Sequence, residues 1–101
     1  MNYKTQNQKK INSNRTSLQG YINVSYDELI TLFGKPINYD DYKSDAEWVL
    51  EFEDGLVATI YNWKDGFNYC GDEGLPTEDI TEWHVGGKTK EVVDRIINLI
   101  N

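Results

Sequence analysis

A single histidine and a single cysteine are the side chains in this sequence best suited to catalysis. His84 lies in the segment Thr81 to Val85, and Glu82 falls on the same side of a strand. A histidine oriented by a carboxylate can activate a nucleophile, for which Cys70 or a hydroxyl would have to serve. No spacing matches a nucleophile motif. We therefore expect no catalytic residues and interpret His84 as structural or interfacial, with a small enzyme that uses His84 as an alternative.

The sequence gives little support for a metal site or a phosphate-binding site. One histidine and one cysteine fall short of a zinc site. Four oxygen ligands do not have the spacing of an EF-hand loop, namely Asp72, Glu73, Glu78 and Asp79. Gly86-Gly87, followed by Lys88 and a helix, would suit a small anion, but a simple strand-to-helix turn is the favoured interpretation. We expect neither a metal nor a cofactor.

Carboxylates form the most distinctive surface feature. Seven fall within 15 residues: Asp40, Asp41, Asp45, Glu47, Glu51, Glu53 and Asp54. Glu47, Glu51 and Glu53 are expected to point the same way from one strand, at steps of roughly 6–7 Å. This resembles the repeat of phosphates along a nucleic-acid strand, so the row could imitate one. A solvated sheet face is the simpler interpretation.

The charge is divided unevenly along the 101 residues. Residues 1–18 carry a formal +4 and no acid, whereas the remainder carries −11, giving −7 in total. An acidic body repels a phosphate backbone, so we expect no direct nucleic-acid binding by the folded part. It would be attracted to a basic surface on a partner, although solubility alone could explain the charge.

The same composition predicts one domain without a membrane segment. No apolar run is long enough to span a bilayer, and no secretory signal is present. The lone cysteine fits a reducing compartment, so a cytoplasmic location is expected. Residues 1–18 are predicted to be a flexible basic tail, with a partner-binding arm, or an arm folded across the acidic body, as the alternative. Residues 19–101 are predicted to form a single acidic α+β domain.

The elements that position these groups centre on a hairpin over residues 46–63. Alternating apolar residues flank Asp54-Gly55, which is a strong hairpin signal. A strand at Tyr21 to Val24 precedes a capped helix at Ser25 to Phe33, which Gly34 and Pro36 terminate.

Two further elements complete the expected fold. Thr81 to Val85 reads as a strand ended by Gly86-Gly87, and a helix follows over residues 90–100. The order β-α-β-β-β-α predicts a two-layer sandwich, a small antiparallel sheet with both helices on one face.

Several motifs resemble a group of small proteins encoded by bacteriophages and prophages. They are Leu32-Phe33-Gly34-Lys35-Pro36, Ala46-Glu47-Trp48, Phe52-Glu53-Asp54-Gly55, Ala58-Thr59-Ile60-Tyr61-Asn62-Trp63-Lys64 and Glu82-Trp83-His84-Val85-Gly86-Gly87. The resemblance covers about Gly20 to the C-terminus and brings no established catalytic residues. Small acidic phage proteins of this kind resemble counter-defence factors, such as anti-CRISPR proteins or sponges for cyclic nucleotide signals.

The leading hypothesis is therefore a non-enzymatic phage protein that binds and blocks a host immune component in the cytoplasm of the infected bacterium. The partner would be a defence protein or nucleoprotein with a basic surface. The binding surface would combine the seven carboxylates with the aromatic anchors Tyr61, Trp63 and Tyr69.

The second hypothesis is a sponge that sequesters a cyclic nucleotide. Its pocket would use stacking rings and cations, namely Trp63, Lys64, Tyr69, Trp83, His84, Lys88 and Arg95. Self-association is compatible with every hypothesis.

Overall fold

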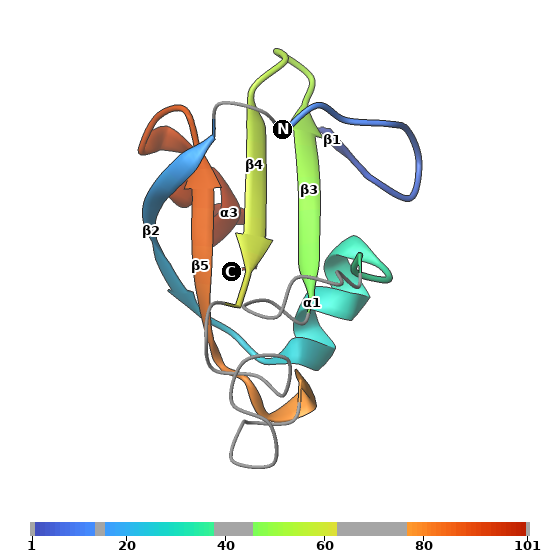
Figure 1. Cartoon of the computed structure of the whole chain (residues 1–101), viewed down its shortest axis with the longest axis vertical. Coiled ribbons are helices and arrows are strands. Elements are labelled where there is room, and N and C mark those ends of the chain that lie inside the picture. Colours follow the sequence, from blue (N-terminus) through green and yellow to red (C-terminus); the bar gives the residue numbers. More distant parts are fainter. Residues whose placement is uncertain (1, 14–15, 38–45, 63–76, 101) are drawn as a thin grey trace.

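A computed structural model describes residues 2–13, 16–37, 46–62 and 77–100 of the chain (Figure 1). Strands and helices alternate irregularly along the sequence. Their bounds are β1 Tyr3–Thr5, β2 Ser17–Asn23, α1 Tyr26–Phe33, β3 Glu47–Phe52, β4 Val57–Tyr61, the 3-10 helix η2 Thr77–Asp79, β5 Glu82–Gly87 and α3 Glu91–Ile100.

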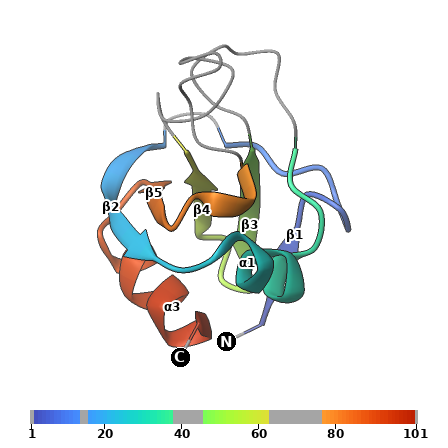
Figure 2. The ribbon, with the colours of Figure 1, turned by 90° about the horizontal axis from the view of Figure 1, so that it is seen from below.

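The strands form one five-stranded antiparallel sheet in the order β1-β3-β4-β5-β2. Helices α1 and α3 lie on the same side of this sheet (Figure 2). The α+β class and the antiparallel sheet with two helices on one face are therefore confirmed. The predicted β-α-β-β-β-α order matches β2 through α3, and β1 is an additional strand.

The central hairpin of β3 and β4 forms as its sequence pattern predicts. Leu50 pairs with Ala58, and Trp48 pairs with Ile60. Gly55 has a φ of 88° in the connecting turn, a conformation that glycine adopts without the clash of a Cβ. Its backbone N–H donates to the carbonyl of Phe52 at 2.8 Å, which closes the turn.

The core lies between the sheet and the two helices. Trp48 and Trp83 are fully buried there, and their rings meet edge to face with centroids 5.3 Å apart. Each indole N–H donates to a backbone carbonyl, that of Gly34 at 2.8 Å and that of Val24 at 3.1 Å. The two tryptophans thus bury large apolar surfaces without leaving a polar atom unsatisfied.

Helix α1 has the predicted ends. The Ser25 hydroxyl accepts a hydrogen bond from the backbone N–H of Glu28 at 3.2 Å, which satisfies one donor of the first turn. Gly34, with a φ of 80°, ends the helix and donates its N–H to the carbonyl of Ile30. Leu29 and Phe33 are the buried residues of this helix.

The prediction of a flexible tail is wrong for residues 3–5, which form β1 against β3. Tyr3 holds this strand because its ring contacts Phe33 and Phe52, with centroids 5.5 and 6.3 Å away. Gln6 then continues the attachment by donating its N–H to the carbonyl of Val49 and accepting the N–H of Val49 with its side chain. Gln6, one of the polar residues that suggested a solvated tail, is therefore bonded to the sheet.

Two strand boundaries also differ from the prediction. Strand β2 begins at Ser17 rather than at Tyr21, and β5 continues through Gly86-Gly87, which were expected to break it. Close packing explains these glycines, since a Cβ on Gly86 would lie 2.4 Å from Thr59 Oγ1. The pair is buried within β5 and does not form a phosphate-binding turn.

Candidate functional site

A row of polar aromatic side chains crosses the side of the sheet that faces away from the helices. Register places Glu47, Tyr61, His84 and Tyr21 side by side on β3, β4, β5 and β2. The His84 ring stacks on Tyr61 at 5.4 Å and meets Tyr21 edge-on at 4.9 Å. We call this surface, with Val49, Glu51, Val57 and Thr59, the helix-free face.

The environment of His84 includes two tyrosine rings. Burial raises the pKa of Tyr61, and the negative charge of Glu47 raises it further, so this phenol stays protonated. The ring that stacks on His84 is therefore a neutral phenol. Cys70, the thiol considered as a nucleophile, lies outside the described residues. The arrangement supplies aromatic contact area.

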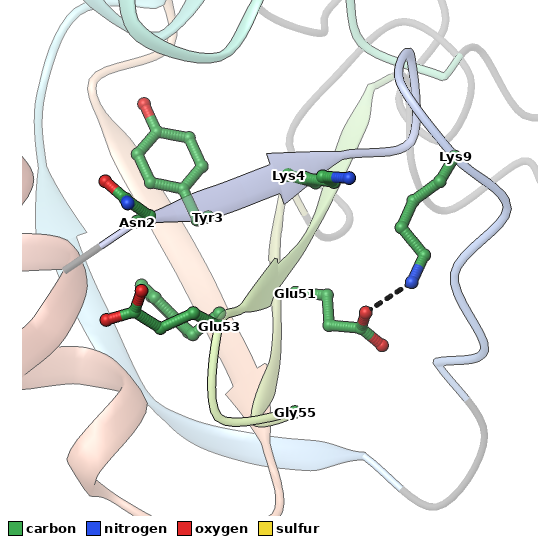
Figure 3. Close-up of a pocket in the computed structure, with 8 residues that line it drawn as sticks. Asn2, Tyr3, Lys4, Lys9, Glu51, Glu53 and Gly55 are labelled. Carbon is green, nitrogen blue, oxygen red and sulfur yellow. Dashed lines mark hydrogen bonds and ion pairs between the residues drawn. The ribbon is translucent and has the colours of Figure 1, made fainter.

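The expected row of three carboxylates is wrong in its geometry. Figure 3 shows Glu51 pointing toward Lys9 and Glu53 pointing the opposite way. The reason is that β3 ends at Phe52, so Glu53 already belongs to the turn. Glu51 pairs with Lys9 at 2.6 Å and lies across the strands from Lys4.

The basic N-terminal segment therefore neutralises part of the face that was expected to be acidic. A pocket of about 300 Å³ lies at this junction, lined by Tyr3, Lys4, Lys9, Glu51 and Glu53 among others (Figure 3).

Asp54 lies on the helix side of the molecule. Its two carboxylate oxygens accept hydrogen bonds from Arg95 at 2.7 and 2.8 Å. The bound guanidinium lowers the pKa of Asp54 to about 2. Arg95 also pairs with Glu91 one turn earlier and lies over the ring of Phe52 at 5.1 Å. This arginine is already engaged by carboxylates, which argues against its expected role in phosphate binding.

Among the described residues, those expected to form the nucleotide pocket do not lie together. Trp83 is fully buried in the core, whereas His84 lies on the helix-free face, because successive residues of a strand point to opposite sides. Lys88 is exposed between β5 and α3. The remaining predicted site residues lie outside the described part of the chain, namely Asp40, Asp41, Asp45, Trp63, Lys64 and Tyr69.

A second acidic surface forms where η2 packs against α1. It consists of Asp27 and Glu28 from the first turn of α1 and Glu78 and Asp79 from η2, and we call it the acidic end. All four side chains are exposed, and none is ion-paired within the described part of the chain.

Tyr26, the first residue of α1, belongs to the same region as the acidic end. Its half-buried ring stacks on Trp83 at 6.3 Å and contacts Trp48 at 5.8 Å, which fixes its position. Burial raises the pKa of Tyr26, and the charges of Glu78 and Asp27 raise it further. Carboxylates from two separate elements therefore influence the same phenol.

Sequence reasoning did not find the acidic end. Glu78 and Asp79 were considered only as weak calcium ligands. About 50 residues separate the two carboxylate pairs, so local spacing carries no signal of their proximity. Among the described residues, no three His, Cys, Asp or Glu side chains converge to hold a metal ion. The acidic end is spread out, which suits a broad cationic surface.

Comparison with protein-family models gives no match, and a search of curated proteins finds no relative. No helix within the described ranges has the length and apolar character needed to cross a bilayer.

Proposed function

We propose that this protein is a non-enzymatic phage counter-defence protein of the anti-CRISPR kind, which binds and blocks a host immune component through an acidic surface. The observation that carries the proposal is the acidic end, whose four exposed carboxylates form no ion pair within the described residues. Two of them, Asp27 and Glu78, act on the half-buried ring of Tyr26. An aromatic anchor within a charged rim is the usual anatomy of a binding hot spot.

The partner's chemistry follows from the charge. The chain has a net charge of −7, and two of its cations, Lys9 and Arg95, are paired with its own carboxylates. A basic surface on a defence protein or nucleoprotein would be attracted over a distance and would be oriented by the acidic end. We propose that this partner lies in the cytoplasm of the infected host, as the resemblance to small phage proteins implies.

The test is capture of a partner from a lysate of a defended bacterial host, followed by elution with a salt gradient. We expect a bound protein that elutes at moderate salt, because exposed charges are screened. Replacing Glu28→Gln, Glu78→Gln and Asp79→Asn together should reduce the captured amount at least tenfold and weaken the salt dependence.

The matched control removes three exposed negative charges elsewhere, through Glu53→Gln, Glu82→Gln and Asp94→Asn. This control should retain the partner, since it leaves the acidic end intact. Equal loss in both variants would mean that only total charge matters, and retention in both would contradict the assigned surface. A variant with Glu47→Gln and Glu51→Gln tests whether the helix-free face contributes.

A further inference from the structure

Strand β2 is an unusually unprotected sheet edge. It is the outermost strand on its side and pairs only with β5 within the described sheet. Its seven residues, Ser17–Asn23, include no charge and no proline. Monomeric proteins usually protect such edges with short strands, lysines or prolines, because free backbone groups pair with other chains. The opposite edge, β1, has this protection, since it is three residues long and carries Lys4.

Apolar side chains gather beside the same edge. In the described part of the chain, the exposed large hydrophobic residues are Leu18, Tyr21 and Ile97, at 46%, 53% and 38% exposure. Two of them belong to β2, and the third belongs to α3, which packs beneath it. A pocket of about 240 Å³ lies between these elements and is lined by Tyr21, Ile97 and Ile100 among others. A chain that binds at this edge could therefore form backbone hydrogen bonds with β2 and apolar contacts with these side chains.

We propose that a second copy of this chain occupies this edge, with β2 pairing antiparallel to the β2 of its partner. Antiparallel pairing of identical strands requires a two-fold axis perpendicular to the sheet, so each face continues into the same face of the other copy. Both α3 helices then lie on one side, where Ile97 and Ile100 meet their counterparts. In such a two-fold dimer, each β2 edge is paired with the other, so no free β2 edge remains.

The register of this pairing follows from an irregularity in β2. The pairing with β5 shifts between Leu18 and Gly20, which leaves Gly20 to Asn23 as the regular part of the edge. A two-fold axis at Tyr21 places this residue opposite itself, where cross-strand rings interact well. The helix-free face then becomes continuous through Tyr21 and His84 of both copies.

The absence of charged residues on β2 favours a second copy of this chain over a basic partner at this edge. A basic segment would find no carboxylate on β2, in contrast with the acidic end. Two copies with a net charge of −7 each repel one another, so their contact needs an uncharged strip such as this edge. Added salt should therefore strengthen the dimer, whereas it should weaken binding at the acidic end.

The test is sedimentation equilibrium of the full chain from about 1 to 300 µM, at low and at physiological salt. We expect a reversible monomer–dimer equilibrium that salt shifts toward the dimer. Tyr21→Lys and Ile97→Lys should each weaken dimerisation at least tenfold, since both side chains are exposed and their replacement spares the core. Asn98→Lys adds the same charge at a neighbouring exposed position of α3 and should have little effect.

Hydrogen exchange locates the contact independently. Backbone amides of residues 20–23 that point away from β5 should become protected as protein concentration rises. A monomer throughout the concentration range would overturn the proposal. So would a dimer that tolerates both lysine variants, or monomers whose β2 instead binds a foreign strand. The dimerisation test is independent of the partner-capture test. The dimer contact is formed by β2 and α3, whereas the acidic end is formed by α1 and η2.

Discussion

At the scale of single residues, Arg95 connects the hairpin turn to the last helix. Its guanidinium binds Asp54 of the turn through two hydrogen bonds, pairs with Glu91 and covers Phe52. Such a fork-to-fork contact fixes orientation as well as charge, which a lysine could not reproduce. The i,i+4 spacing of Glu91 and Arg95 is visible in the sequence, whereas the contact with Asp54 requires the tertiary fold.

This contact predicts a dependence of stability on pH. The pKa of Asp54 is about 2 when folded, below its ordinary value of 3.8, so folding favours the carboxylate. Its stabilising contribution is therefore complete above about pH 4 and is lost as the pH falls through about 2. Urea midpoints of the wild type and of Asp54→Asn should differ at pH 5 and converge near pH 2. A difference that stays constant over this range would contradict the assignment.

Tyr3 is the residue that attaches the N-terminal strand. Tyr3→Ala should destabilise the protein by about 2–3 kcal/mol, because its ring is partly buried against Phe33 and Phe52. Tyr3→Phe should cost about 1 kcal/mol, the usual value of a hydrogen bond such as that to the Leu32 carbonyl. Urea denaturation measures the stability of both variants. Lys4→Ala serves as the control and should change the stability only slightly. Equal stability of all three variants would mean that β1 does not contribute to folding.

At the scale of elements, the glycines of β5 determine how closely the neighbouring strand packs. The position that a Cβ of Gly86 would take is occupied by the hydroxyl of Thr59, which is buried on β4. This explains how β5 continues through a Gly-Gly pair, which by composition alone is a strand breaker.

Gly86→Ala should therefore destabilise the protein by about 1–3 kcal/mol through overpacking. The same change in a Thr59→Ala background should cost less than half as much, because the obstructing oxygen is absent. A double-mutant cycle of urea denaturation measures this coupling. Additive effects of the two substitutions would contradict a direct clash.

The local patterns predicted the hairpin, the capped helix α1 and the final helix, because each depends on residues that are neighbours in sequence. They failed at β1, where the polar composition of residues 1–18 concealed Tyr3 as an anchor. They also failed at Glu53, since the end of β3 was placed too late by one residue. The acidic end could not be predicted, because only the packing of η2 on α1 brings Glu78 to Tyr26.

At the scale of the whole molecule, charge and apolar surface lie in different places. The basic N-terminal segment is held on the sheet, where Lys9 neutralises Glu51, and the unpaired carboxylates of α1 and η2 stand together at the acidic end. Exposed apolar surface lies on the uncharged strand β2, at Leu18 and Tyr21, and at Ile97 of α3. The basic partner and the second copy that we propose would therefore bind at separate surfaces.

Phage plating tests most directly whether the acidic end blocks a host defence. The protein would be expressed in a panel of bacterial strains that each carry one defence system, and a sensitive phage would be plated on each. We predict that the wild type and the Glu53, Glu82 and Asp94 control restore plating on at least one strain. The variant of Glu28, Glu78 and Asp79 should fail there while remaining folded. Restoration by all three proteins, or by none on any strain, would contradict the claim.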